Sequence, residues 1–234
     1  MTRAGRVLVG AGLLAAGCGV LRHAGLRWGA SEVELAAVLP GDDVLPAPDL
    51  VATRAITVRA DPGAVWPWLA QIGWGRGGFY SYDALENLVG LRIHSADEVV
   101  EAWQDVRVGD VVHLAEPVAL DVVVADPGRA LVLAGVTPAG EPAPAPYDYT
   151  WAFVLRAGNE AGTTRLVVRE RYVARSAAGR VAVEAVAALS AVMTERMLRG
   201  VRDRVERASQ PRRARAGPPA YGRRRRWSPA RGGR

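Results

Sequence analysis

The chain has 234 residues, of which 50% are apolar and 23% are charged, a composition typical of a folded globular protein. All 30 basic residues are arginines, but residues 31–210 hold 17 of them against 24 acidic residues, so the surplus positive charge lies at the two ends. This distribution argues against a nucleic-acid-binding domain, which carries its positive charge on the folded surface. The single Cys18 excludes an internal disulfide and every multi-cysteine metal or redox motif. We therefore expect no metal, no cofactor and no specific nucleic-acid partner.

Residues 1–29 begin with an apolar run, Val7 to Leu21, that has arginines on both sides. As a helix, this run would span about 22 Å, less than the roughly 30 Å of a hydrocarbon core. It fits a short uncleaved membrane anchor, a lipoprotein signal with Cys18 as the modified residue, or a soluble helix, and we favour the anchor. The expected location is thus at the membrane through the N-terminus, with the cytoplasm as the alternative.

The next segment, residues 30–49, is rich in proline and acidic residues and is expected to link the N-terminal segment to a domain over residues 50–208. Residues 209–234 hold nine arginines among glycine, proline and serine. Because they have almost nothing to bury, we expect a basic disordered tail, either solvated or attached to an anionic surface.

The first part of the domain predicts one strand and two short helices. Residues 51–60 alternate as a strand, in which Arg54 shares a face with apolar residues. Asp61-Pro62 predicts the start of a helix over Pro62–Ile72, and Ser81 caps a second predicted helix over Ser81–Val89. Between them, Gly73–Gly78 matches the dinucleotide fingerprint G-x-G-x-x-G but follows a helix instead of a strand. We interpret it as a loop.

The second part predicts antiparallel strands and a long helix. A strand over 108–114 precedes a hairpin, 120–124 with 130–134, and residues 147–155 carry the strongest period-two alternation. In the strand over 163–173, Val168, Glu170 and Tyr172 share one face and arginines occupy the other. Residues 178–208 predict a helix whose apolar stripe includes Met193 and Met197.

Helices confined to one face of an antiparallel sheet make an α+β fold. The order of elements resembles the helix-grip fold of the START-like (SRPBCC) superfamily, which includes polyketide cyclase/dehydrase-like and lipid-transfer proteins. The resemblance implies a curved antiparallel sheet wrapped around a long C-terminal helix, with two short helices after the first strand, and it brings no catalytic motif. Six segments are similar to a bacterial branch that often has an apolar N-terminal segment: Thr53-Arg-Ala-Ile-Thr-Val, Val65-Trp-Pro-Trp-Leu, Gly75-Arg-Gly-Gly-Phe-Tyr-Ser-Tyr-Asp, Trp103-Gln-Asp, Val108-Gly-Asp and Arg169-Glu-Arg-Tyr.

The helix-grip fold implies an elongated, mostly apolar pocket between the sheet and the long helix. The alternative is that the same side chains fill a core and leave no cavity. The candidate ligand-binding residues are Arg54, Tyr80, Tyr82, Trp103, Trp151, Phe153, Val168, Glu170, Tyr172, Met193 and Met197.

Three functions remain open at this point. The first is non-catalytic binding or carriage of a small hydrophobic ligand, lipid-like or aromatic, at the membrane. The second is an aromatase/cyclase-type enzyme in which Glu170 or His113 acts as acid or base, and the third is an interaction module with a filled core. Catalysis needs a titratable group inside the pocket. Because Glu170 is the one good candidate, the sequence favours binding.

Arg54 and Glu170 are both predicted to point inward from neighbouring strands, because the first and last strands of the helix-grip fold lie side by side. A buried charge needs a partner. The two residues therefore form either a structural ion pair or the polar end of the pocket, where they orient a ligand headgroup.

Overall fold

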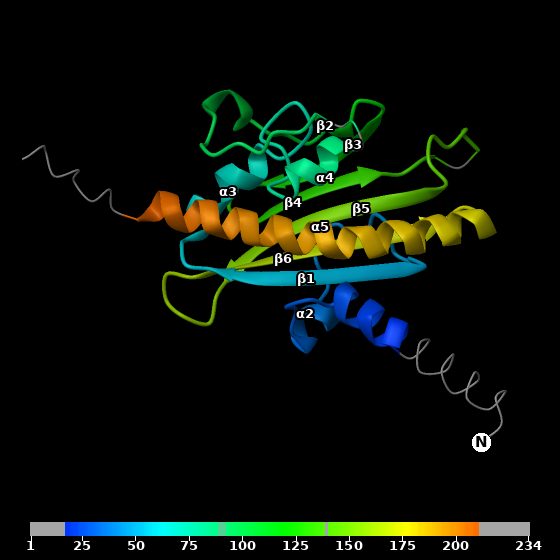
Figure 1. Ribbon diagram of the computed structural model, residues 1–234, viewed down its shortest axis with the longest axis horizontal. Coiled ribbons are helices and arrows are strands. Elements are labelled where there is room, and N and C mark those ends of the chain that lie inside the picture. Colours follow the sequence, from blue (N-terminus) through cyan, green and yellow to red (C-terminus); the bar gives the residue numbers. More distant parts are fainter. Residues whose placement is uncertain (1–16, 89, 91, 139, 211–234) are drawn as a thin grey trace, which may run out of the picture.

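A computed structural model describes residues 17–88, 90, 92–138 and 140–210. Six strands form one antiparallel sheet in the order β1-β6-β5-β4-β3-β2, and the helix α5 runs along one face of it (Figure 1). This confirms the predicted α+β, helix-grip architecture. The strands are β1 (Leu50–Val58), β2 (Val111–Ala115), β3 (Val118–Asp126), β4 (Ala130–Gly135), β5 (Tyr147–Ala157) and β6 (Thr164–Ala174), and the helices are α2 (Glu32–Ala36), α3 (Pro62–Ala70), α4 (Asp83–Leu88), the 3-10 turn η1 (Glu101–Trp103) and α5 (Ala177–Ser209).

The helix boundaries follow from local chemistry. Pro62 opens α3 as predicted, and Ser176 caps α5 by accepting a hydrogen bond from the Gly179 amide. The predicted cap at Ser81 is wrong, because α4 begins at Asp83 and the Ser81 hydroxyl donates to the Met193 carbonyl at 3.1 Å. Ser81 therefore ties the segment before α4 to α5.

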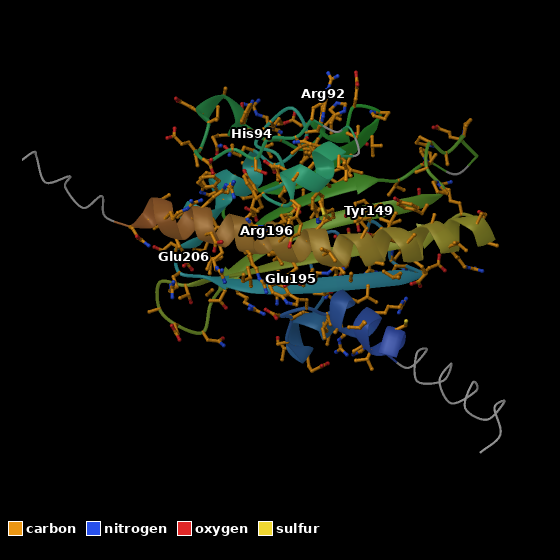
Figure 2. The ribbon with its side chains drawn as sticks, viewed as in Figure 1. Arg92, His94, Tyr149, Glu195, Arg196 and Glu206 are labelled. Carbon is orange, nitrogen blue, oxygen red and sulfur yellow. The ribbon has the colours of Figure 1, made fainter. Side chains whose placement is uncertain are left out.

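The carboxyl-terminal half of α5 packs tightly against the sheet and α3. Leu198, Val201 and Val205 are fully buried there. The backbone of Tyr80 passes so close to Gly200 that a Cβ at this position would collide with the Tyr80 carbonyl oxygen. Glu206 (labelled in Figure 2) pairs with Arg59 at 2.8 Å, at the same end of the helix. From Leu198 onward, the interface between α5 and the sheet is therefore close-packed.

Residues 30–49, expected as a linker, lie against the outer face of the sheet, the face away from α5. Leu39 packs on Ala55, Val154 and Val167 there. Arg169 extends from β6 to this segment and donates hydrogen bonds to the carbonyl oxygens of residues 34, 35 and 37. The segment is thus fastened to the sheet by both apolar and polar contacts.

Residues 17–26 are helical and contact α5 and β1. Arg22 forms a two-bond ion pair with Glu184 of α5, both at 2.7 Å, and the Gly25 carbonyl accepts from Arg54 Nε at 2.7 Å. In Figure 1 this segment and the start of α5 lie at the same end of the molecule. Most of the predicted anchor (residues 1–16) and the predicted tail from residue 211 lie outside the described residues.

One described helix, α5, is long and apolar enough to cross a membrane when judged by length and composition. The same helix covers the inner face of the sheet, and the core helix of a folded domain meets the same criteria. The property therefore does not distinguish a membrane span from a core helix.

Candidate functional site

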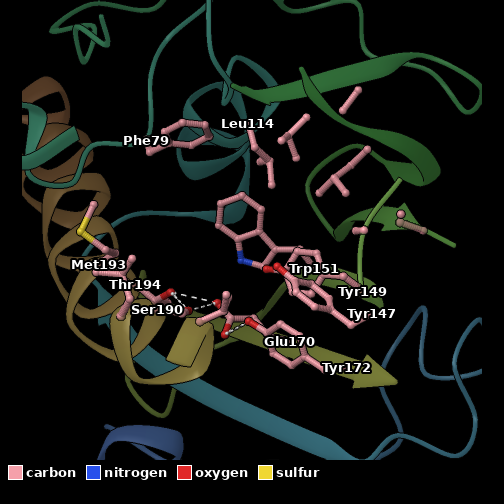
Figure 3. A pocket seen from close by; sticks show the side chains of 18 of the residues that line it. Phe79, Leu114, Tyr147, Tyr149, Trp151, Glu170, Tyr172, Ser190, Met193 and Thr194 are labelled. Atoms are coloured by element: carbon pink, nitrogen blue, oxygen red, sulfur yellow. Dashed lines mark hydrogen bonds between the residues drawn. The ribbon is translucent and has the colours of Figure 1, made fainter. Parts of the chain in front are cut away.

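A cavity of about 530 Å³ lies between the sheet and the middle of α5, from Val186 to Met197 (Figure 3). Its walls come from β2 to β6, from the loop after β4, from the segments before and after α4 and from α5, and most of its surface is apolar. Because the carboxyl-terminal half of α5 is close-packed, the inner face of the sheet is divided into a filled end and a hollow end. Pockets of this size and character are typical of small-molecule sites.

Four aromatic side chains form one wall of the cavity. Tyr147, Tyr149 and Trp151 alternate along β5, so the period-two geometry of a strand turns all three toward α5. Tyr172 on β6 contacts both tyrosines, with its ring centroid 5.7 Å from that of Tyr147 and 4.8 Å from that of Tyr149. The wall therefore offers flat apolar surfaces, together with the hydroxyl groups of Tyr147 and Tyr149.

At the base of this wall lies a buried carboxylate, Glu170, whose two oxygens receive four hydrogen bonds. Oε1 accepts from the Ser190 and Thr194 hydroxyls at 2.6 and 3.0 Å. Oε2 accepts from Arg54 Nη1 at 2.9 Å and from the Tyr172 hydroxyl at 3.3 Å. A carboxylate can accept about this many bonds, so the protein itself satisfies the group.

The predicted inward pair of Arg54 and Glu170 is confirmed as an ion pair, with side chains 0% and 2% exposed. Glu170 lines the cavity, whereas Arg54 lies behind it and is not part of the lining. Arg54 also donates to the Gly25 carbonyl, so it joins the base of the cavity to the N-terminal helix. Its position supports the structural interpretation of the pair.

The tyrosine hydroxyls of the cavity stay protonated at neutral pH. Burial, followed by the nearby negative charge of Glu170, raises the pKa of both Tyr149 and Tyr172 well above the ordinary value. Burial also raises the pKa of Tyr147. The aromatic wall is therefore uncharged.

Five of the predicted site residues line the cavity: Trp151, Glu170, Tyr172, Met193 and Met197. Phe153 lies two residues after Trp151 on β5, and Val168 lies two residues before Glu170 on β6. Both are fully buried in the core next to the cavity. The inward orientation predicted for them is correct, but their position is too deep to form part of the lining. Contact with a ligand stays a prediction for all of these residues.

The three predicted aromatic residues outside the strands do not line the cavity. Tyr80 is buried under α5, where its hydroxyl donates to the Trp68 carbonyl at 2.9 Å. Tyr82 is 40% exposed, with Arg196 over its ring, and Trp103 is partly buried in η1. Sequence alone could not place them, because all three follow loops whose path is set by tertiary packing.

His113, the other acid or base considered, is exposed on β2 and does not line the cavity. Its ring contacts Trp74 edge-on at 6.4 Å. Neighbouring positions on β2 and β3 turn toward the cavity, but the alternation of the strand turns His113 away. The titratable groups of the described lining are Glu170, Asp121 and the three tyrosines.

Among the lining residues that the sequence did not predict, four carry hydroxyl groups next to the predicted ones: Tyr147, Tyr149, Ser190 and Thr194. The two tyrosines share the parity of Trp151, so the same alternation, carried toward the start of the strand, would have found them. Ser190 and Thr194 are one helical turn apart on α5, and their hydroxyls lie 3.1 Å from each other. Two small polar residues on the otherwise apolar inner stripe of a helix are the sequence feature that could have predicted their place at the cavity.

The glycine-rich segment after α3 is a loop, as interpreted. Gly73 and Gly78 exchange two backbone hydrogen bonds of 3.1 Å, which closes a tight turn between α3 and α4. Among the described residues, no group of three or more His, Cys, Asp and Glu side chains could hold a metal ion.

No protein-family model matches the chain, and no curated protein matches it either. Among solved structures, the chain is similar to the protein XoxI from Bacillus cereus, at 16% identity over 65% of this chain and 93% of that one, with a TM-score of 0.40. It is similar to MLL2253 from Mesorhizobium loti, at 12% identity over 69% and 100%, also with a TM-score of 0.40. A third similarity is to BexL, a di-domain ARO/CYC of the BE-7585A biosynthetic pathway, at 13% identity over 69% of this chain and 48% of BexL, with a TM-score of 0.41. Likeness at this level says nothing about what this chain binds.

Proposed function

We propose that the chain binds and carries a small hydrophobic molecule, lipid-like or aromatic, in the cavity between the sheet and α5. The observation that carries the proposal is the cavity itself, about 530 Å³ of mostly apolar space beside close-packed core. Packed cores leave few voids larger than a water molecule, and a hollow of this size with mostly apolar walls exposes apolar surface to water unless a ligand covers it. A hydrophobic ligand is the occupant that fits such walls.

Binding is proposed in place of aromatase/cyclase-type catalysis because neither carboxylate of the cavity is placed to act as an acid or base. Glu170 is the buried carboxylate of the cavity, and its four hydrogen bonds leave no free lone pair with which to take a proton from a ligand. Asp121 is exposed on β3 at the other wall. A carrier needs no acid or base, so this arrangement suits carriage.

The test is the binding of N-phenyl-1-naphthylamine, a neutral probe whose fluorescence rises in apolar surroundings. Val186→Trp places a large ring in the cavity from the helix side, whereas Val181→Trp adds the same ring on α5 at a residue that is 72% exposed and outside the lining. We expect the wild type and Val181→Trp to bind the probe and Val186→Trp to lose at least tenfold in affinity. Equal binding by both variants would show that the probe binds elsewhere.

We also propose that the ligand is exchanged at a membrane. The apolar run Val7–Leu21 supports this proposal, together with the exposed Val20 and Leu21 on the helical segment that contacts α5. Leu189, at the edge of the cavity, is 63% exposed. Apolar surface thus occurs both on the N-terminal helix and at the edge of the cavity, where a bilayer could meet it.

A vesicle flotation assay tests the membrane proposal. The chain lacking residues 1–16 is the appropriate comparison, because residues 22 and 25 contact Glu184 and Arg54 and should be kept. We expect the full-length chain to float with vesicles and the shortened chain to remain in solution. If both chains float equally, or neither does, residues 1–16 are not the anchor.

A further inference from the structure

The indole N–H of Trp151 is a hydrogen-bond donor without a partner in the described part of the chain. Trp151 is 7% exposed, its Nε1 atom is buried, and the residue lines the cavity. Figure 3 shows the indole in the middle of the lining, beside Tyr149 and Tyr147. An indole can only donate, and a buried donor without an acceptor lowers stability. The atom therefore calls for an acceptor that enters the cavity.

The nearby carboxylate of Glu170 is not available as that acceptor. Its oxygens already receive hydrogen bonds from Ser190, Thr194, Arg54 and Tyr172. These four bonds come from elements on both sides of the cavity base, α5 on one side and β1 and β6 on the other. The carboxylate is thus fixed in place, and a bound molecule can supply the acceptor that the indole lacks.

The charges at the site argue against an anionic ligand. The positive charge of Arg54 is neutralised by Glu170, and none of the described lining residues is basic. The carboxylates of Glu170 and Asp121 would repel a second anion, and the raised pKa values of Tyr149 and Tyr172 keep those hydroxyls neutral. Burying an anion without a cationic partner is costly. A free fatty acid would therefore be disfavoured.

We propose that the ligand is a neutral, mainly apolar molecule with a carbonyl oxygen, as in an aryl ketone, and that this oxygen accepts the hydrogen bond of Trp151 Nε1. This rests on the proposed binding function and narrows its ligand class. The carbonyl supplies the missing acceptor, and an attached flat ring packs against the aromatic wall of Tyr147, Tyr149 and Tyr172. Trp151 is the residue that distinguishes a carbonyl compound from a hydrocarbon of the same shape.

Three matched probes test this inference with the full-length chain by equilibrium dialysis: 2-acetonaphthone, 2-ethylnaphthalene and 2-naphthoate. Trp151→Phe removes the donor but keeps an aromatic ring. We expect this variant to weaken 2-acetonaphthone about fivefold more than 2-ethylnaphthalene, the effect of one neutral hydrogen bond. The comparison between the two probes cancels the change in cavity volume. The control Trp103→Phe, outside the lining, should leave the ratio unchanged, and 2-naphthoate should bind at least tenfold more weakly than the ketone at pH 7.

A second measurement needs no substitution. The infrared carbonyl stretch of 2-acetonaphthone bound to the wild type should move to lower frequency than in hexane, because a hydrogen bond weakens the C=O bond. Three results would each overturn the proposed ligand class. They are an unshifted carbonyl stretch, an equal loss of affinity for both neutral probes in Trp151→Phe, and tighter binding of 2-naphthoate than of 2-acetonaphthone. If none of the three probes binds, the proposed binding function itself fails.

Discussion

Two neighbouring residues of β6 show how differently the two faces of the sheet treat buried polar groups. Arg169 points to the outer face, where five acceptors from residues 34–42 and from Thr53 surround it. Glu170 points to the inner face, where four donors satisfy it, but a cavity and an unpartnered Trp151 lie above it. On the outer face the Arg169 guanidinium makes five hydrogen bonds, and Asp42 Oδ1, which makes none, still pairs with Arg171 at 3.1 Å. On the inner face the chain leaves space and two buried donors without a hydrogen-bond partner among the described residues, Arg54 Nη2 and Trp151 Nε1. We therefore propose that the outer face stabilises the fold and that the inner face binds the ligand.

The largest expected effect comes from the outer face. Arg169→Met removes a guanidinium that is 3% exposed and leaves three backbone carbonyls without this donor. Asp42 loses one of its partners but keeps the Leu39 amide and Arg171. We expect a loss of about 4 kcal/mol in the free energy of unfolding, measured in urea. Arg156→Met, on β5, makes no hydrogen bond to any described residue and serves as the control, with less than about 0.5 kcal/mol expected. Equal losses would mean that the outer-face network adds nothing.

Glu170→Gln sharpens the distinction between structure and binding at the base of the cavity. The amide leaves Arg54 buried without its counter-charge, so we expect a loss of about 3 kcal/mol in stability. Because the carboxylate is saturated by the protein, the affinity for N-phenyl-1-naphthylamine, measured by fluorescence titration, should change less than about twofold. A tenfold loss of affinity in the folded variant would show that Glu170 orients the ligand.

The two halves of α5 offer a matched pair of leucines. Leu198 is fully buried in the filled end, whereas Leu189 is 63% exposed at the edge of the cavity. We expect Leu198→Ala to lower the free energy of unfolding by about 3 kcal/mol and Leu189→Ala by less than about 1 kcal/mol. Thermal or urea unfolding of both variants checks this. Similar losses would contradict the division of the helix into a filled and a hollow end.

The smallest expected effect is a loss of stability in acid that comes from Glu34. Burial alone would raise the pKa of Glu34, but hydrogen bonds from Arg165 and Ser31, with the charge of Arg165, outweigh burial and lower it to about 2. Since the folded pKa is below the unfolded one, the stabilisation is complete above about pH 4.5 and disappears as the pH falls toward 2. Glu34→Gln should thus be less stable than the wild type by about 2 kcal/mol at pH 7, in urea, with the difference vanishing near pH 2. A difference that persists at pH 2 would contradict this origin.

The sequence could predict the fold because its periodicities are simple. Alternation along residues 147–155 and 163–173 gave the inner face of the two central strands, and the apolar stripe of residues 178–208 gave the helix that covers them. The same alternation predicted that Arg54 and Glu170 point inward, and the resemblance to the helix-grip fold, in which the first and last strands are neighbours, placed them together. The structure confirms the pair at 2.9 Å.

Periodicity could not separate cavity from core, because both present apolar side chains on the same face. Phe153 and Trp151 are equivalent by parity, yet Phe153 is core and Trp151 lines the cavity, a difference set by how far α5 stands from the sheet. The packing of residues 30–49 was also out of reach, since it depends on contacts more than 100 residues apart in the chain. Only the Ser31/Glu34 capping box of α2 was readable locally.

The central claim, that the hollow end of the sheet holds a small hydrophobic molecule, is tested most directly by native mass spectrometry of the full-length chain purified without denaturant. We predict a species heavier than the chain by the mass of one small molecule, which organic extraction releases and which the Val186→Trp variant lacks, whereas Val181→Trp retains it. A spectrum that contains the bare chain alone, or the same added mass in Val186→Trp, would contradict the claim.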